Sequence, residues 1–503
     1  MKKLLIYVLV LAMLALPLLT ACGDSDDKSN AGTTSGTGNN GETNNGETEN
    51  PLATFPLEEM KYDATINVLT RSGHHTQQFV YVEDSKSETI NKAVKDRNEL
   101  IQEKYGITIE VIPVNLPLET LQEDLTSDLQ TYHIVSENVY NMTQKITEGY
   151  FYSLNDLLQL NQPWWDQNVN FQLTLSDKIF FVAGNATYTD DLYTACILYN
   201  KTAYATQYES AYGSIYDLVD DGKWTIDLMT EMAKEFAHPD ESGQWMTTGA
   251  YYGVVTDGYT GATMLTNGSG AVSAYKDEQN NIQLSGGSEA SVNAFDKVYQ
   301  LLNDTTVSVY AEQFKPTDWN YGGSLFLSNQ AMFQVTYIGS LLGIMTNESA
   351  NKVVPGAVPI PKYDEAQEKY HSGINVYQST VMAIPVSNRD FLEETTYAME
   401  LMGYYSMMES QFGKDSVTAA FYETSLKMQS VDTDDDSRML DLITSNRIYD
   451  LGGAFNWGGN LIGLYSSNLY KGANTLASTW DANLDGVKIE LQKTIDAWKS
   501  SIN

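Results

Sequence analysis

Strand, helix and strand succeed one another in "ATINVLT" (Ala64–Thr70), "SETINKAVKDRNELIQEKYG" (Ser87–Gly106) and "ITIEVIPV" (Ile107–Val114). The first and third segments are apolar and rich in β-branched residues, a composition typical of buried strands. The second segment carries an apolar stripe at helical spacing and ends at Gly106, a residue type favoured at helix C-caps. This order and spacing predict a βαβ unit in a parallel sheet.

The same signals recur further along the chain. "YHIVSEN" (Tyr132–Asn138) predicts the end of another strand, and "AMFQVTY" (Ala331–Tyr337) and "TVMAIPV" (Thr380–Val386) predict two more. Thr225 is placed to cap a helix whose first turn contains Asp227. Strands and helices that alternate over so long a chain indicate an α/β protein with more than one core.

The N-terminus has the pattern of an export signal. Lys2 and Lys3 precede an apolar run from Leu4 to Leu19, and small residues then lead to Cys22. We therefore assign residues 1–21 to a signal peptide, which is too short to favour a permanent membrane span. The ending "LTAC" resembles the lipobox of bacterial lipoproteins, which implies that Cys22 is acylated and that lipid holds the protein at the membrane. An ordinary secretory signal with an incidental cysteine is the alternative.

Residues 22–60, beginning with the acylated cysteine, form a predicted linker. Up to Asn50 this segment has hardly any apolar side chain and is rich in Gly, Asn and Thr. Such a stretch cannot offset its ordering entropy, so we expect it to be disordered and to act as a flexible tether.

The composition excludes several classes of protein. The net charge of −35 argues against nucleic acid, whose phosphates would be repelled, and against close adsorption to anionic lipid. Cys22 and Cys196 are the only cysteines, so we expect no intramolecular disulfide, and Cys196 lies in an apolar run typical of a buried thiol. The sequence predicts no metal site, no cofactor and no enzymatic activity, since its five histidines have one close pair, His74 and His75, and no hydrolase or P-loop motif is present.

Seven segments, in order along the chain, carry a resemblance to a known family. They are "AVKDRNELIQEKYGITIEVIPV" (93–114), "ACILYNKTAY" (195–204), "DDGKWTIDLMTEMAKEF" (220–236), "LFLSNQAMFQVTYIGSLLGI" (325–344), "VVPGAVPIPKYDEAQEKYHSG" (353–373), "STVMAIPVSNRDFLEETTYAMELM" (379–402) and "FYETSLKMQSVDTDDDSRMLDLI" (421–443). Together they resemble the extracellular solute-binding lipoproteins of bacterial ABC importers, in particular the family 1, sugar-binding type. Each match is weak alone, and their common order from Ala64 to Asn503 makes the resemblance specific.

This resemblance implies a two-lobe, periplasmic-binding-protein-like α/β fold of type II, with an interlobe ligand cleft. The two lobes are expected to be joined by hinge segments near residues 195–200, 375–380 and 428–432. We assign residues 61–195 and 380–428 to the first lobe and residues 196–379 and 429–503 to the second.

Polar and aromatic side chains near strand ends and hinge loops are the candidate ligand contacts, because ligands bind at the carboxyl ends of strands in open α/β sheets. Aromatic rings pair with the C–H faces of sugars, and Asp and Asn side chains bond their hydroxyls. For each residue a structural role in a loop, cap or hinge is the alternative. The predicted ligand-binding residues are Arg71, Ser72, His74, Asn138, Tyr140, Asn141, Asp190, Asp191, Trp319, Asn320, Tyr337, Asn456 and Trp457. Trp164 and Trp165, in contrast, are expected to pack under a loop.

The resemblance implies a protein at the extracytoplasmic face of the cell membrane that captures a carbohydrate, for which we expect an oligosaccharide. The protein is expected to be a monomer whose lobes close around the solute and deliver it to ABC permease subunits served by a separate ATPase. A binder of peptide or another small solute is the first alternative.

Three other interpretations fit the sequence less well. Asp190 and Asp191 make a poor glycosidase pair, because adjacent strand residues point to opposite faces. The segment "DTDDDSRMLDLI" from Asp432 is acidic at three positions of a calcium loop but lacks its glycine, so an acidic helix start near Asp436 explains it better. A surface glycan adhesin would need exposed aromatic rows on repeated β-modules, which the sequence lacks.

Overall fold

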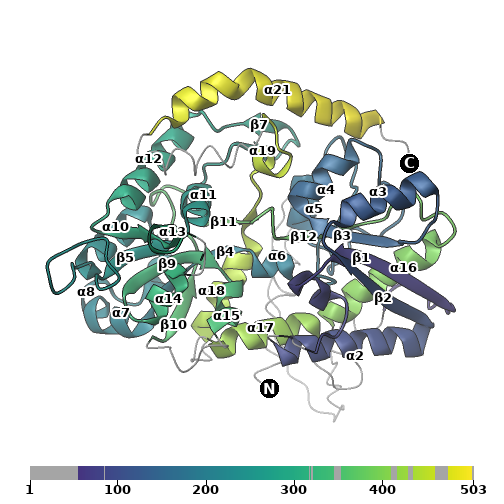
Figure 1. Ribbon diagram of the computed structural model, residues 1–503, viewed down its shortest axis with the longest axis horizontal. Helices are drawn as coiled ribbons and strands as arrows, with labels where there is room; N and C mark the ends of the chain where they lie inside the picture. The colour runs from purple at the N-terminus through teal and green to yellow at the C-terminus, as the bar shows by residue number, and fades with distance from the viewer. Residues whose placement is uncertain are drawn as a thin grey trace, which may run out of the picture. The chain divides into compact units, whose positions relative to one another are not determined.

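The computed structural model describes residues 55–83, 85, 87–316, 318, 321–344, 353–408, 416–428, 434–458 and 474–500. Its strands form two main sheets, which Figure 1 shows side by side with their helices around them. The first sheet has the order β12-β3-β1-β2, and the second has the order β10-β4-β9-β5-β8. We call each sheet, with the helices that cover it, the β1 half and the β4 half.

The β1 half contains the predicted βαβ unit. β1 (Ala64–Arg71) pairs in parallel with β2 (Ile107–Val114), and α2 (Glu88–Tyr105) connects them. β3 (Ile134–Asn138) joins β1 in parallel, whereas β12 (Thr380–Ala383) comes from far along the chain and pairs antiparallel with β3. The strands predicted in these four segments are confirmed.

The ends of α2 show why the helix begins and stops where it does. The Ser87 side chain accepts a hydrogen bond from the backbone N–H of Ile90 and caps the first turn. Gly106 ends the helix with φ 69°, and a Cβ atom there would lie 2.0 Å from the backbone oxygen of Tyr62. Both the left-handed conformation and the close approach require glycine, so the predicted C-cap is confirmed.

Short helices and two long ones cover the β1 sheet. Aromatic and aliphatic side chains on alternate strand positions fill two hydrophobic clusters, one on each face. The covering elements, besides α2, are η1 (His74–Gln78), α3 (Pro117–Ser127), α4 (Val139–Ile146), α5 (Gln167–Leu173) and α16 (Leu392–Met407). α17 (Val417–Met428) packs along α2 and α16, and its buried residues share a hydrophobic cluster with β4 of the second sheet.

The β4 half is built around a mixed sheet. β4 (Ala195–Asn200) lies antiparallel to both β10 (Pro355–Val358) and β9 (Ala331–Tyr337). β5 (Tyr252–Thr256) pairs in parallel with β9 and with β8 (Ser308–Tyr310). The strand predicted over Ala331–Tyr337 is therefore confirmed.

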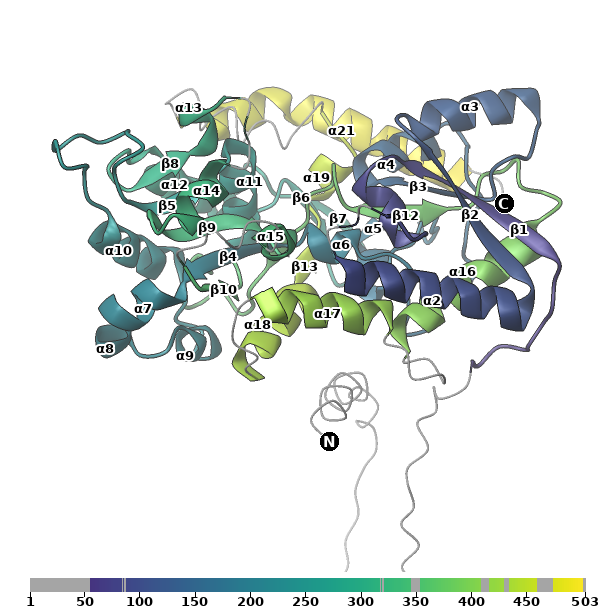
Figure 2. The same ribbon diagram turned by 60° about the horizontal axis from the view of Figure 1, so that its bottom comes forward.

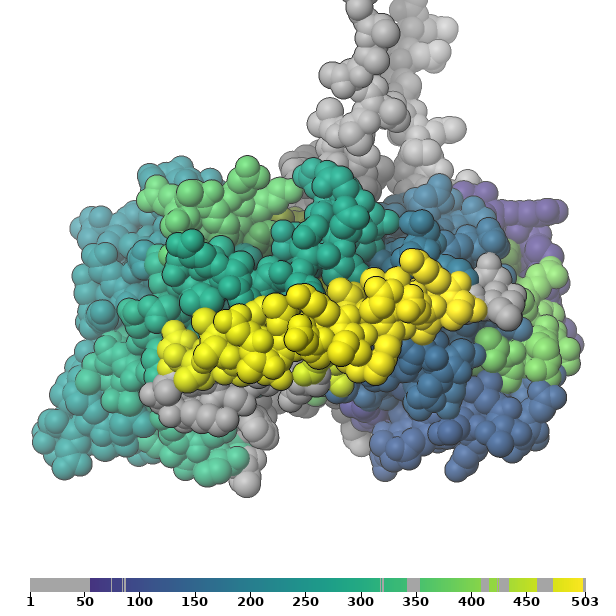
Figure 3. Space-filling view, turned by 90° about the horizontal axis from the view of Figure 1, so that it is seen from above, coloured from purple at the N-terminus to yellow at the C-terminus, as the bar shows by residue number. Residues whose placement is uncertain are grey.

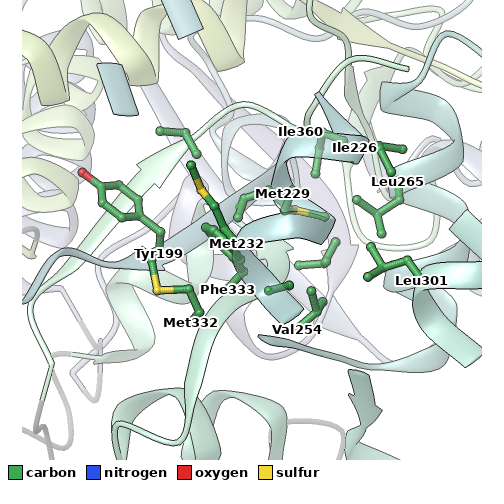
Figure 4. Packing of buried hydrophobic residues seen from close by; sticks show 14 of the residues in the cluster. Tyr199, Ile226, Met229, Met232, Val254, Leu265, Leu301, Met332, Phe333 and Ile360 are labelled. Atoms are coloured by element: carbon green, nitrogen blue, oxygen red, sulfur yellow. The ribbon is translucent and has the colours of Figure 1, made fainter. Parts of the chain in front are cut away.

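Alternate residues of β4 pack on opposite faces of this sheet. Ile197 and Tyr199 belong to the cluster drawn in Figure 4, where Met229 and Phe333 fill the centre. Cys196 belongs to the opposite cluster, and burial raises the pKa of its thiol, as expected for an inert buried cysteine. The helices of this half are α7 (Lys201–Gln207), α8 (Glu209–Tyr212), α9 (Ile215–Asp220), α10 (Ile226–Phe236), α11 (Gly258–Gly268), α12 (Glu289–Asn303), α13 (Ala311–Phe314), α14 (Tyr321–Leu327), α15 (Gly339–Ile344) and α18 (Asp434–Ser445).

Two of the predicted helix starts are confirmed. The Thr225 side chain accepts a hydrogen bond from the N–H of Leu228 and caps α10, with Asp227 in its first turn. The acidic segment around Asp436 begins α18, where carboxylates favour the positive end of the helix dipole. No described group of three or more His, Cys, Asp or Glu side chains could hold a metal ion.

Two segments of described chain cross between the halves beside each other. One follows α6 (Thr189–Leu192) into β4, and the other follows β11 (Ser372–Gly373) into β12. The backbone N–H of Asn375 donates a hydrogen bond to the backbone carbonyl oxygen of Tyr193 at 3.1 Å. β13 (Arg447–Ile448) pairs in parallel with β11, so a later part of the chain lies against the second crossing. Figure 2 shows α2 and α17 packed side by side along one edge of this region.

The remaining elements connect to both halves. They are β6 (Ala274–Lys276), β7 (Ile282–Leu284), α19 (Leu451–Ala454) and α21 (Leu476–Ser500). β6 and β7 form an antiparallel hairpin, and α21 is the last described helix. Within the described chain, no helix has the length and apolar character needed to span a membrane.

Trp164 and Trp165 are buried, as predicted for residues that pack under a loop. Both indoles donate to one oxygen of Glu400 on α16, at 2.6 and 3.1 Å, and the Gln159 N–H donates to the other oxygen. Burial raises the pKa of Glu400, and the three donors partly oppose that rise. One acidic side chain therefore holds the loop onto the helix.

Glu400→Gln should lower the free energy of unfolding by about 1–3 kcal/mol, because glutamine has only one oxygen for three donors and places an amide N–H₂ against a buried N–H. Chemical denaturation followed by tryptophan fluorescence measures the change. The exposed Glu148, which pairs with Lys145 on the surface, offers the control Glu148→Gln, which should change little. Equal effects of the two substitutions would contradict this account of Glu400.

Candidate functional site

The carboxyl ends of β1 and β3 place an ion pair at the edge of the β1 sheet. Arg71, the last residue of β1, lies 2.9 Å from the carboxylate of Glu137 on β3. The Glu137 side chain is 2% exposed, and burial raises its pKa although the Asn138 N–H and Arg71 favour the charged form. The Nε atom of Arg71 is buried and has no hydrogen-bond partner among the described residues. Arg71 therefore keeps one donor available beside its ion pair.

The other predicted residues of this edge have local partners as well. Asn138 accepts a hydrogen bond from the Asn141 N–H and caps α4. Ser72 donates to the side-chain oxygen of Asn115 at 2.8 Å. His74 begins η1 directly after the strand. These residues lie where the strand-end rule predicts a site.

Tyr337 occupies the matching position in the β4 half. It ends β9, and its hydroxyl accepts hydrogen bonds from Thr260 at 3.0 Å and from the Asn375 amide at 3.1 Å. Asn375 lies on the crossing segment that leads to β12, so this bond joins the sheet of one half to the connection with the other. Asp257, which directly follows the neighbouring β5, caps α11 by accepting a hydrogen bond from the Thr260 N–H.

Tyrosine rings from both halves meet between these two sheet edges. Tyr140 on α4 lies 4.7 Å from Tyr377, and Tyr377 lies 5.9 Å from Tyr259 on α11. Tyr193 and Tyr337 lie 5.9 Å apart, edge to face. We call these five residues the tyrosine cluster. It joins α4 of the β1 half to α11 and β9 of the β4 half through the crossing segments.

The Tyr259 hydroxyl is buried in the tyrosine cluster and has no hydrogen-bond partner among the described residues. Burying a hydroxyl without a hydrogen-bond partner costs free energy of folding. We therefore expect a ligand or a water molecule to bind this hydroxyl. Burial raises the pKa of Tyr193 and of Tyr377 to about 12, so both hydroxyls remain neutral at physiological pH. Neutral hydroxyls both donate and accept, a property that suits an uncharged polar ligand.

Asp190 and Asp191 lie in a buried ion cluster instead. Arg447 on β13 lies 2.6 Å from Asp190, 3.2 Å from Asp191 and 3.4 Å from Asp166. Burial raises the pKa of Asp190, and the Arg447 guanidinium opposes that rise. The alternative that these residues have a hinge role thus agrees with their position, because Arg447 engages their carboxylates at the crossing.

Trp457, which follows Asn456, belongs to the hydrophobic cluster of the β1 half against which Tyr140, Tyr259 and Tyr377 also pack. The sequence suggests an accessible indole in a glycine-rich loop, but the structure buries the Trp457 ring completely. The ring stacks on Phe455 at 5.1 Å, and its Nε1 donates to Thr494 on α21. Asn456 adopts a left-handed conformation with φ 55°. Packing of the C-terminal helix over this loop, which no local signal reveals, makes Trp457 a core residue.

Three predicted residues, Cys22, Trp319 and Asn320, lie outside the described residues. Three residues of the tyrosine cluster, Tyr193, Tyr259 and Tyr377, are absent from the ligand contacts predicted from the sequence. Tyr259 follows the end of β5, where the strand-end rule could have found it. Tyr377 has no such signal, because its position depends on how the crossing segment lies against α4 and α11.

No protein-family model and no curated protein matches this chain. Solved structures do match. The ABC substrate-binding protein Lmo0181 from Listeria monocytogenes, in complex with cycloalternan, is 10% identical, covers 86% of this chain and 100% of its own, and has a TM-score of 0.53. The maltose/maltodextrin-binding domain MalE from Bdellovibrio bacteriovorus, bound to maltotriose, is 13% identical, with 85% and 100% covered and a TM-score of 0.53.

A cyclo/maltodextrin-binding protein complexed with maltotetraose is 14% identical, with 87% and 98% covered and a TM-score of 0.53. At such identities the likeness concerns the fold, and it extends over most of this chain and nearly all of each neighbour. The resemblance seen in the sequence is confirmed at that level. The chain therefore has the α/β two-sheet fold of the sugar-binding substrate-binding proteins of ABC transporters.

Proposed function

We propose that this protein is the membrane-anchored, extracytoplasmic solute-binding component of an ABC transporter and that it captures a carbohydrate, specifically an oligosaccharide. The observation that carries the proposal is the tyrosine cluster, in which rings from both halves meet and the buried hydroxyl of Tyr259 has no hydrogen-bond partner among the described residues. The fold shared with sugar-binding neighbours supports the same conclusion. The protein carries out no chemical step on its ligand.

The chemistry of the cluster suits a sugar. Tyrosine rings offer flat apolar faces to sugar C–H groups, and their hydroxyls pair with sugar hydroxyls. Further polar contacts would come from the amide of Asn375, the carboxylate of Asp257 and the Nε of Arg71, which has no hydrogen-bond partner among the described residues. An extended ligand could reach from the Arg71 edge to Tyr337, which is why we favour an oligosaccharide.

Solute capture would proceed by movement of the two halves about the crossing segments. A ligand that contacts Tyr140 and Tyr337 together binds the closed arrangement better and shifts the population toward it. The closed monomer would then dock on its permease subunits, which a separate ATPase drives. Acylation of Cys22 would keep the protein at the membrane by lipid alone while the linker leaves the body free to move.

A thermal-shift screen of the Cys22→Ser chain against mono- and oligosaccharides, with peptides as the comparison, tests the proposal. We expect stabilisation by at least one oligosaccharide, because a ligand that binds only the folded state raises the melting temperature. A response to peptides alone would replace the carbohydrate by a peptide, and release of a hydrolysis product would make the protein an enzyme.

Tyr259→Phe should weaken binding of the solute found in that screen by about three- to tenfold, the effect of one lost neutral hydrogen bond. The free energy of unfolding of the unliganded protein should not fall, because the hydroxyl has no partner among the described residues and its removal relieves the cost of burying it. Calorimetry and denaturation measure the two quantities. Tyr275→Phe, at an exposed ring on β6, is the matched control and should change neither. Unchanged affinity in Tyr259→Phe would remove this hydroxyl from the site.

A further inference from the structure

We infer that the β6–β7 hairpin is a latch that holds the two halves together and limits their relative movement. Chain order puts the hairpin between α11 and α12, which pack in the same cluster of the β4 half through Leu265 and Val298. Yet Ala274, Ile282 and Leu284 of the hairpin pack with the cluster of the β1 half. The hairpin therefore leaves one half and docks on the other.

Lys276 is the polar anchor of this docking. Its ammonium donates to the backbone oxygens of Phe171 and Thr174 at the C-terminal end of α5, and it lies 4.8 Å from the centre of the Phe171 ring. The last carbonyl groups of a helix lack partners within the helix and attract cations. Burial lowers the pKa of Lys276 to about 8, so the charged form still predominates at pH 7. At the turn of the hairpin, Asn280 donates to Asp177 at 3.2 Å.

The base of the hairpin is held by the C-terminal segments. Asp450, which caps α19, accepts hydrogen bonds from the backbone N–H groups of Ser273 and Ala274. Trp480 of α21 covers Gly286 and Gly287, where a Cβ atom would lie 2.5 and 2.1 Å from indole atoms. Glycine is required there for contact with the ring.

α21 itself lies across both halves, as Figure 3 shows in yellow. Near its start, Asn474 donates to Asp296 of α12 in the β4 half. Near its end, the Trp498 indole donates to the Lys178 oxygen beside Phe180 in the β1 half. The hairpin and α21 therefore contact each other and together connect the two halves. Within this connection, the contacts of the Lys276 ammonium with α5 can be removed by a single substitution.

Relative movement of the halves must either preserve the Lys276 contact or break it. If the latch restrains the movement, its loss widens the range of arrangements that the unliganded protein samples. The effect of losing the Lys276 contact on solute affinity rests on the proposed function, since closure would then start from a different population of arrangements. The effect of the same loss on the movement of the halves in the unliganded protein is independent of the proposed function.

The test compares Lys276→Met with Lys223→Met in the chain carrying Cys22→Ser. Lys223 is an exposed lysine that pairs within its own turn with Asp221. Spin labels at Leu129→Cys and Gln207→Cys, one exposed site in each half, report the distance between the halves, while buried Cys196 is protected from labelling. Hydrogen exchange of residues 274–284 reports docking of the hairpin.

In Lys276→Met, hairpin amides should exchange about tenfold faster, and the distribution of label distances should broaden. Lys223→Met should match the parent in both measurements. Unchanged exchange would show that Lys276 does not hold the hairpin, and faster exchange with unchanged distances would show that the hairpin does not restrain the halves; either overturns the inference. A broadened distribution in a protein that binds no solute would retain the latch and reject the proposed function.

Discussion

Arg447→Met is expected to lower the free energy of unfolding by about 3–5 kcal/mol, the cost of leaving buried charge without its partner. Arg447 is the cation that the described residues place beside Asp166, Asp190 and Asp191, and Asp190 and Asp191 lie on α6 where the chain crosses between the halves. Burial alone would lower the pKa of Arg447, but the three carboxylates hold it well above its usual value. Methionine preserves most of the side-chain volume, so the loss reflects charge rather than a cavity.

The loss of unfolding free energy caused by Arg447→Met should be smaller at pH 5 than at pH 8. Burial already raises the pKa of Asp190 and Asp191 above their ordinary value of 3.8, and removing Arg447 raises both further. Between the pKa of each carboxyl group in the unfolded state and its higher pKa in the folded variant, the folded state binds more protons than the unfolded state. The stability of the variant therefore falls as the pH rises through this window. Chemical denaturation at both pH values measures the difference.

Arg438→Met is the matched control for Arg447→Met. Arg438 pairs with Asp220 and Asp435, but its side chain is 42% exposed and water replaces the lost contacts. Its removal should cost less than about 1 kcal/mol at either pH. A loss of stability in Arg447→Met that is equally small, or that grows as the pH falls, would contradict the view that this cluster is buried and that one guanidinium balances the charge of three carboxylates.

Lys201→Met should also cost about 3–5 kcal/mol, because it removes the ammonium that pairs with the fully buried carboxylate of Asp436. Both oxygens of Asp436 lie 2.8 Å from the Lys201 ammonium, and the Tyr216 hydroxyl donates to one of them. This contact joins α18 to the start of α7. It therefore fixes α18, which follows α17 in the chain, to the β4 half. Chemical denaturation of the unliganded protein measures the loss.

The double variant Lys201→Met with Asp436→Asn should recover more than half of that loss. Asparagine removes the buried charge and still accepts from Tyr216. Lys493→Met offers a control at an equally short pair, since Glu490 lies 2.7 Å away but both side chains are exposed, and it should cost less than about 1 kcal/mol. No recovery in the double variant would show that the ammonium acts through packing rather than through the charge of Asp436.

The elements with strong local signals could be predicted in detail. β1, α2 and β2 agree with their predicted ranges to within a residue or two, because apolar periodicity and the Gly106 cap act over a few neighbouring residues. The same holds for Thr225 at α10 and the acidic start of α18. The strand-end rule also brought Arg71 and Tyr337 to the edges of the two sheets. The lobe boundaries and ligand contacts stay predictions.

Side chains whose roles depend on distant segments could not be predicted in this way. Arg447, more than 250 positions later, forms ion pairs with Asp190 and Asp191, and no local pattern in the sequence indicates this contact. Trp457 looks accessible until Thr494 and α21 are placed over its loop.

The amino-acid sequence by itself determined which segments become strands and helices, and with them the α/β class, because those preferences arise from the spacing of apolar residues and from caps within a single turn. Only the tertiary structure decided which side chains meet. The tyrosine cluster, the Arg447 ion cluster and the docking of Lys276 on α5 each join segments far apart in the chain. Their contacts depend on packing between whole elements, and that packing leaves no periodic trace in the sequence.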